Sequence, residues 1–247
     1  MSEQAASPAR REQLRAWAIH IFTAFGAVTG FLSLLAVAQE RPTAALIWLG
    51  VSMVIDGIDG PLARRFTVTD ALPRVDGEVL DHVIDYMTYA VIPALFLYQF
   101  AFLPAGLNLI AAAAIMMTSL YCFANRDAKT KDNFFAGFPA AWNLIVLCFF
   151  LLQPPGWLTI ATVVVCVVLT FIPITFIHPF RVKAMRSVTL TLTAVWSAVT
   201  LVAVVLQDPG GGLWNSYPLL LWAFIVLSAY FVAVSFIRAA WGKLELG

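Results

Sequence analysis

Charged residues are scarce in this chain of 247 residues: 12% are Asp, Glu, Lys or Arg, whereas 61% are hydrophobic and the mean hydropathy is +0.86. A soluble domain of this length cannot bury so much apolar surface. The composition therefore excludes a soluble globular protein and indicates a protein that crosses a membrane several times. The formal net charge of +1 gives no indication of a nucleic-acid partner.

Cysteine is also scarce, and its spacing excludes two further kinds of site. Cys122, Cys148 and Cys166 all lie inside apolar runs and form no Cys-x-x-Cys pair. They are best interpreted as packing residues rather than as metal ligands or redox centres. We expect no cleavable signal peptide, because the first fourteen residues are polar and the apolar run that follows is long enough to span a membrane.

Eight apolar runs approach or exceed the length of a membrane-spanning helix, which needs roughly 20 residues. They cover about 15–39, 43–63, 78–103, 105–124, 137–152, 156–177, 187–206 and 217–240. The sequence thus predicts an all-α polytopic membrane protein with about eight transmembrane helices. We expect a tail over 1–14, a membrane domain over 15–240 and a second tail over 241–247.

The positively charged residues predict the orientation of these spans. If the N-terminus is cytoplasmic, every one of the 15 Lys and Arg residues except Arg41 falls on the cytoplasmic side. Such a bias is typical of cytoplasmic loops and also supports an even number of spans. Both termini are therefore predicted to be cytoplasmic.

Acidic residues gather at the cytoplasmic ends of the second and third spans. The four aspartates in these two segments are Asp56, Asp59, Asp81 and Asp85. At about 100° per residue, Gly60, Ala63 and Arg64 share one helix stripe with the first two aspartates. Gly77 shares a stripe with the other two. Because a short connection makes the helices antiparallel neighbours, the two stripes are predicted to face each other.

Four carboxylates in a membrane protein need an explanation. On insertion scales each costs roughly 2.5–3.5 kcal/mol at the centre of a span, or on the order of 10 kcal/mol together. Crowded carboxylates also repel one another unless protons or cations neutralise them. An all-oxygen cluster suits Mg²⁺ or Mn²⁺, and two such ions balance four negative charges.

The residues next to the aspartates indicate a place for a phosphate group at this site. Small residues at Gly60 and Ala63 leave room for a ligand, and Arg64 is suited to a phosphate. Together with the metal ligands they indicate a diphosphate held through divalent cations. Asp76 and Glu78 are better explained as charges at a helix N-terminus. His20 in the first span is best interpreted as a packed, hydrogen-bonded residue rather than a ligand.

The residues of this site resemble a known signature, that of the CDP-alcohol phosphotransferases. The matching pattern is Asp56-x₂-Asp59-Gly60-x₂-Ala63-Arg64 followed by Gly77-x₃-Asp81-x₃-Asp85. The family consists of integral membrane enzymes that transfer a phosphoryl-linked group from a CDP-linked donor to an alcohol and release CMP. One departure is a longer connection between Arg64 and Gly77 than the family usually has.

The resemblance implies a role for each matching residue. Asp56, Asp59, Asp81 and Asp85 would hold the divalent metals, with Asp85 also the general base for the acceptor alcohol. The residues implied in CDP binding are Asp56, Gly60, Ala63, Arg64 and Gly77. The implied location is the bacterial inner membrane with the active site on the cytoplasmic side, among membrane lipid. A homodimer is expected from the resemblance alone.

Two further segments resemble the bacterial members of the family that form phosphatidylcholine from CDP-diacylglycerol and choline. They are DNFFAGFPAAWN at 132–143 and FIPITFIHPFRV at 171–182. A quaternary ammonium cannot donate a hydrogen bond, so aromatic faces and diffuse negative charge recognise it. The expected choline contacts are Tyr86, Tyr89, Phe138, Trp142 and Asn143. His178 and Arg181 are expected either to bind phosphate or to serve as positive-inside loop charges.

Two alternatives stay open. The same enzyme class with serine as acceptor would make phosphatidylserine and would need a cation such as Arg126 or Arg181 for the serine carboxylate. A carboxylate-based cation transporter is a different class of protein. It would need polar residues along a path through the bilayer, whereas the last three spans are almost purely apolar and the acidic cluster lies on one side.

Overall fold

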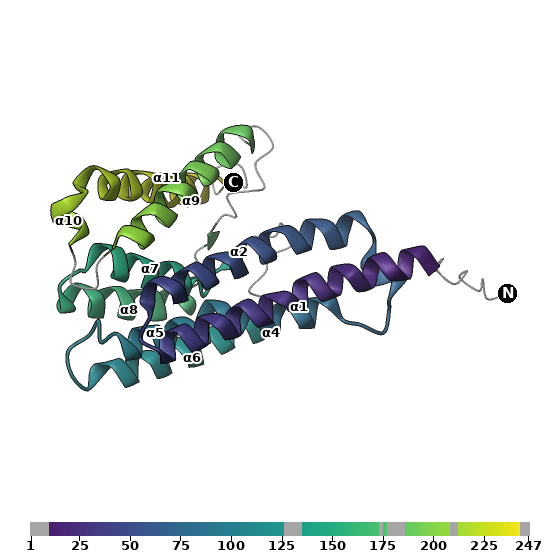
Figure 1. The fold of residues 1–247 in the computed structure, drawn as a ribbon, viewed down its shortest axis with the longest axis horizontal. Helices are drawn as coiled ribbons and strands as arrows, with labels where there is room; N and C mark the ends of the chain where they lie inside the picture. Colours follow the sequence, from purple (N-terminus) through teal and green to yellow (C-terminus); the bar gives the residue numbers. More distant parts are fainter. Residues whose placement is uncertain (1–9, 126–134, 173–174, 177–185, 208–211, 243–247) are drawn as a thin grey trace.

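The computed structural model describes residues 10–125, 135–172, 175–176, 186–207 and 212–242 (Figure 1). Most of these residues are helical. The helices are α1 (Arg10–Ala38), α2 (Pro42–Arg65), α3 (Val68–Ala71), α4 (Gly77–Asp85), the π-helix η1 (Tyr86–Val91), α5 (Ile92–Gln99), α6 (Leu107–Ala124), α7 (Trp142–Leu152), α8 (Gly156–Thr170), α9 (Arg186–Leu206), α10 (Leu213–Ser216) and α11 (Pro218–Gly242). The predicted all-α class is confirmed.

The lengths of the helices bear on the predicted spans. Within the described residues, four helical segments are long and apolar enough to cross a membrane: Arg10–Ala38, Pro42–Arg65, Gly77–Gln99 and Leu107–Ala124. Four shorter apolar segments follow at Trp142–Leu152, Gly156–Thr170, Leu190–Leu206 and Pro218–Ala233. The multi-pass membrane character is therefore confirmed, while the count of eight spans and the orientation of the termini stay predictions.

Two strands that the sequence did not predict join distant loops. β1 (Phe135–Ala136) pairs antiparallel with β2 (Thr175–Phe176), so the segments before α7 and after α8 lie together. Gly137 next to β1 has a φ of +95°, and an added Cβ would lie 2.7 Å from the Thr170 carbonyl oxygen. Only glycine fits such a close approach of two backbones.

Helices α1 and α2 form an antiparallel pair along the molecule (Figure 1). Their contact includes hydrogen bonds between small polar residues. The hydroxyls of Thr29 and Ser52 are 2.7 Å apart, and Ser33 donates to the Ala45 carbonyl at 2.8 Å. Small hydroxyl residues let helices approach closely and bond across the interface. This pairing fixes the helix that carries Asp56 and Asp59.

The segment η1 packs on glycines of α1. A Cβ at Gly30 would lie 2.5 Å from the Met87 Cε atom and 3.1 Å from the Thr88 Cγ2 atom, and a Cβ at Gly26 would lie 3.0 Å from the Ile84 Cγ2 atom. The absence of side chains on this face of α1 therefore brings the helix of Asp81 and Asp85 close to the α1–α2 pair.

The third long helix changes its hydrogen bonding directly after Asp85. Residues Tyr86–Val91 form a π-helix, and the Ile92 N–H donates to the Met87 carbonyl five residues back. Pro93 follows in the first turn of α5. Because proline lacks an N–H and its ring collides with the carbonyl four residues earlier, it favours a wider turn at this point.

Candidate metal and diphosphate site

Three of the four predicted carboxylates come together. Asp56 on α2 and Asp81 and Asp85 on α4 each offer an oxygen atom, and these atoms all lie within 4.8 Å of one another. All three residues are partly buried. A group of carboxylate oxygens at this spacing fits a hard divalent cation such as Mg²⁺ or Mn²⁺. The predicted meeting of the two helix stripes is thus observed for these residues.

The start of α4 sets the position of two of these ligands. The Asp76 side chain accepts hydrogen bonds from the backbone N–H groups of Glu78 and Val79 at 3.0 and 3.1 Å. This is an N-cap, which satisfies donors that the first helical turn would otherwise leave unpaired. The interpretation of Asp76 as a helix-terminal charge is confirmed. Its cap fixes the register in which Asp81 and Asp85 reach α2.

Asp59 lies apart from this group of three. It is 5% exposed, and its carboxylate is within hydrogen-bonding reach of the Thr23 hydroxyl on α1. An offset of three residues turns Asp59 away from Asp56 by roughly 60° of helix rotation, which points it toward the helix that covers α2. Thr23 was not among the predicted site residues. Thr23 lies one turn after His20 on α1, and no sequence pattern marked it as a site residue.

Arg64 lies over Gly60. A Cβ at Gly60 would be 3.3 Å from the Arg64 Nη1 atom, so the missing side chain leaves room for the guanidinium group. The charge of Arg64 also acts on Asp59. Ala63 is partly buried on the same turn. The predicted stripe of small residues and one arginine therefore lies beside the carboxylates.

Gly77 at the start of α4 contacts α1. A Cβ there would lie 3.0 Å from the Cε1 atom of His20. The histidine is 7% exposed, and among the described residues its Nε2 atom has no hydrogen-bond partner. The expected packing of His20 is confirmed, whereas the hydrogen bonding also expected of it is not observed at Nε2 among the described residues. Its ring occupies the space that a side chain at position 77 would need.

The predicted aromatic residues divide into two groups. Tyr89 reaches the carboxylates, because its hydroxyl donates to Asp56 Oδ2 at 2.7 Å. Tyr86 instead contacts α6, where its hydroxyl donates to the Met116 carbonyl at 3.3 Å and its ring packs edge-on against Phe123. The two tyrosines of η1 thus contact different helices, Tyr89 contacting α2 and Tyr86 contacting α6.

The second aromatic group lies at the start of α7, which packs against η1. Phe138 and Trp142 meet edge-to-face with ring centroids 5.1 Å apart. Trp142 is 0% exposed and Asn143 is 3% exposed. Within the described part of the chain, Trp142 Nε1 and Asn143 Nδ2 have no hydrogen-bond acceptor. Buried donors without a partner are rare in proteins and suit an oxygen atom of a ligand.

Three predicted basic residues lie outside the described residues. They are His178 and Arg181, expected at phosphate, and Arg126, considered for a serine carboxylate. Their roles stay predictions.

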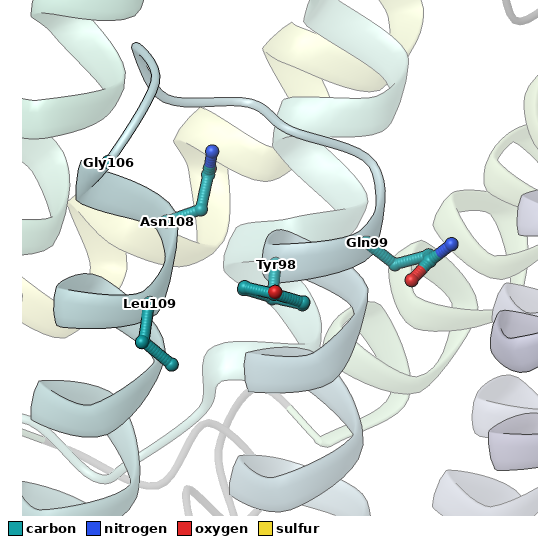
Figure 2. A pocket seen from close by; sticks show the side chains of 5 residues that line it. All are labelled: Tyr98, Gln99, Gly106, Asn108 and Leu109. Atoms are coloured by element: carbon teal, nitrogen blue, oxygen red, sulfur yellow. The ribbon is translucent and has the colours of Figure 1, made fainter.

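A hollow of about 450 Å³ lies at the far ends of α5 and α6, away from the carboxylates (Figure 2). Figure 2 shows the Gln99 and Asn108 side chains pointing in different directions at its rim. Each is already engaged, since Gln99 donates to Glu40 at 3.2 Å and Asn108 bonds the backbone of Leu103. With its polar groups divergent and paired, this hollow lacks the features of a catalytic site.

Comparison with known proteins identifies the family of this chain. The chain matches the family described as CDP-alcohol phosphatidyltransferase over residues 16–172, a range that includes all four aspartates. The chain belongs to this family and is a phosphatidyltransferase enzyme of the membrane.

Three relatives of this chain carry the same name. Phosphatidylcholine synthase of Pseudomonas aeruginosa is 41% identical over 226 residues, which cover 92% of each chain. Phosphatidylcholine synthase of Mesorhizobium japonicum is 48% identical over 186 residues, covering 75% of this chain and 69% of the relative. Phosphatidylcholine synthase of Rhizobium meliloti is 36% identical over 232 residues, covering 94% of each.

Proposed function

We propose that this enzyme transfers the phosphatidyl group of CDP-diacylglycerol to choline, which forms phosphatidylcholine and releases CMP. The observation that carries the proposal is the group formed by Asp56, Asp81 and Asp85, with carboxylate oxygens within 4.8 Å. It occurs in a chain that aligns along most of its length with several phosphatidylcholine synthases. The substrates that those names imply are the basis for choosing choline.

The carboxylates would hold two divalent cations, Mg²⁺ or Mn²⁺. Asp56, Asp81 and Asp85 would supply oxygen ligands from one group, and Asp59 would be the fourth carboxylate of the site. When bound, such an ion neutralises the donor diphosphate and stabilises CMP as the leaving group. The Arg64 guanidinium over Gly60 binds a diphosphate oxygen, and the small Ala63 on the same turn leaves space for the nucleotide.

Asp85 acts as the general base of the transfer. Its carboxylate accepts the proton of the choline hydroxyl while the choline oxygen attacks the phosphorus that carries diacylglycerol. The bond between that phosphorus and the bridging oxygen breaks, and the oxygen leaves with CMP. Asp85 is the last residue of α4 and is followed directly by Tyr86 of η1, so within the carboxylate group it is nearest in the chain to the proposed acceptor residues.

The acceptor site is formed by aromatic residues around η1 and the start of α7. The faces of Tyr86, Tyr89 and Phe138 suit a quaternary ammonium, which binds by cation–π attraction. The unpaired donors of Trp142 and Asn143 suit the acceptor's oxygen. The carboxylates add the diffuse negative charge that a choline cation requires.

The enzyme is placed in the bacterial inner membrane with this site facing the cytoplasm. The distribution of Lys and Arg supports that orientation, because only Arg41 falls on the opposite side. CDP-diacylglycerol then reaches the site from the surrounding lipid, and choline from the cytoplasm. A homodimer is the proposed assembly, from the resemblance to the family alone.

The acceptor is tested by incubating the detergent-purified enzyme with CDP-diacylglycerol, Mn²⁺ and equal concentrations of choline and serine. Mass spectrometry of the lipid products measures the choice. We expect phosphatidylcholine and CMP in equal amounts. A phosphatidylserine product would preserve the mechanism and overturn the acceptor. Metal uptake without CMP release from any alcohol would favour the cation transporter instead.

A further inference from the structure

The hydrogen bond between Tyr89 and Asp56 stands out among the contacts of the site. It joins η1 to α2, its length is 2.7 Å, and its acceptor is one of the three grouped carboxylates. A bond from a hydroxyl to an ionised carboxylate is short and roughly twice as strong as a neutral one. This contact therefore restrains the rotation of the Asp56 carboxylate.

The π-helical turn provides the geometry for this contact. Residues Tyr86–Val91 form the wide turn, and Tyr89 lies in its centre. The neighbouring Thr88 packs on Gly30 of α1, so the backbone that carries Tyr89 is held against the α1–α2 pair. Single π turns in helices occur frequently at functional sites. Here the turn directs the tyrosine hydroxyl across to α2.

We propose that Tyr89 is a positioning residue that orients the Asp56 carboxylate for metal binding, and that it acts through its hydroxyl. This inference rests on the proposed function, because it assumes that Asp56 is a metal ligand. It assigns the hydroxyl to Asp56 and leaves only the aromatic ring available to choline. A partner that hydrogen-bonds a ligating carboxylate fixes its direction and raises its affinity for the metal.

The test is a titration of the full-length protein in detergent with Mn²⁺, following the free ion by electron paramagnetic resonance. Tyr89→Phe keeps the ring and removes the hydroxyl. We expect it to weaken Mn²⁺ binding by about tenfold, the lower end of the range for partners of metal ligands. Tyr98→Phe is the matched control, since it makes the same change on α5 beside the far hollow (Figure 2) and should leave binding unchanged.

A double-mutant cycle separates a positioning role from a general loss of structure. In the Asp56→Ala background, Tyr89→Phe should cause no further loss of Mn²⁺ binding, because alanine already removes the acceptor of the tyrosine hydroxyl. Steady-state kinetics should show a higher Mn²⁺ requirement for Tyr89→Phe with an unchanged KM for choline.

Three results would contradict the inference, and each points to a different alternative. Wild-type binding in Tyr89→Phe would overturn it. A raised KM for choline with unchanged Mn²⁺ binding would overturn it in favour of a direct acceptor contact. If the wild-type protein itself binds no Mn²⁺, the metal site of the proposed function fails first, and the inference fails with it.

Discussion

Polar side chains serve different purposes in the C-terminal helices and in the α2–η1 region. In and next to the C-terminal helices, two contacts pair a donor with an acceptor: Gln207 Nε2 donates to the Phe150 carbonyl at 2.6 Å, and Trp196 Nε1 donates to Ser228 at 2.9 Å. In the α2–η1 region three carboxylates, all acceptors when ionised, meet within 4.8 Å. The first pattern stabilises helix packing by itself, whereas the second requires a cation or protons.

The difference shows how a functional polar group can be distinguished from a structural one. A donor–acceptor pair inside a membrane protein contributes about 0.6 kcal/mol on average and needs no ligand. A group of like charges is destabilising unless a cation or protons neutralise it. Its presence in the protein is therefore best explained by a function. The predictions below test this contrast, from the largest expected effect to the smallest.

Replacing one grouped carboxylate should have the largest effect. Asp56→Asn keeps the size of the side chain and removes a charged ligand. We expect choline-dependent CMP release to fall by at least about 100-fold, because losing a metal ligand should cost no less than the largest effect of mutating a ligand's hydrogen-bond partner. The comparison variant is Asp59→Asn, which changes the aspartate outside the group of three. An equal loss in both variants would show that Asp59 is as necessary for CMP release as Asp56, and wild-type activity in Asp56→Asn would contradict the site.

The close packing of α1 on η1 should be sensitive to added volume. Gly30→Leu drives a side chain into Met87 and Thr88 and is expected to destabilise the protein by about 1–3 kcal/mol, the usual cost of overpacking. Thermal unfolding in detergent measures the change. Gly50→Leu is the control, because a Cβ at Gly50 meets nothing within 4 Å. Equal unfolding temperatures for the two variants would refute the tight α1–η1 contact.

The space that Gly60 leaves for the Arg64 guanidinium group should affect the binding of CDP-diacylglycerol. Gly60→Ala places a methyl group 3.3 Å from the guanidinium group and displaces it. We expect the KM for CDP-diacylglycerol to rise by about tenfold, which corresponds to the loss of one charge-assisted hydrogen bond. Gly57→Ala on the same helix adds a Cβ into open space and serves as the control. A rise in KM for choline instead would place Arg64 at the acceptor.

The C-terminal pairs should affect stability alone. Gln207→Leu removes the donor to the Phe150 and Leu151 carbonyls. We expect a loss of about 0.6 kcal/mol of stability, the average for such bonds in membrane proteins. CMP release per folded molecule should stay at the wild-type level. A clear fall in kcat without unfolding would mean that this half of the molecule takes part in catalysis.

The sequence was sufficient for the parts of the site that follow simple helical geometry. A spacing of four residues places Asp81 and Asp85 on one face, and a short connection brings that face to Asp56. The place of Asp76 at a helix N-terminus was also predicted. The four longest spans could be found because apolar length alone defines them.

Other features depend on contacts between distant segments and could not be predicted. Asp59 turns toward Thr23 because α1 covers that side of α2. The π-helical hydrogen bonding of Tyr86–Val91, from which Tyr89 donates to Asp56, has no signature in the spacing of the aspartates. The pairing of β1 with β2 joins segments on either side of α7 and α8, and no local pattern in the sequence encodes it.

The most direct test of the account is choline-dependent CMP release by the purified enzyme, measured with and without Mn²⁺ and repeated with Asp85→Asn. If the carboxylate group is the catalytic centre, release requires both choline and the divalent ion. It falls by about 10²–10⁴-fold in Asp85→Asn, as expected for the loss of a general base. Undiminished release by Asp85→Asn, or release that persists after chelation of divalent ions, would contradict the account.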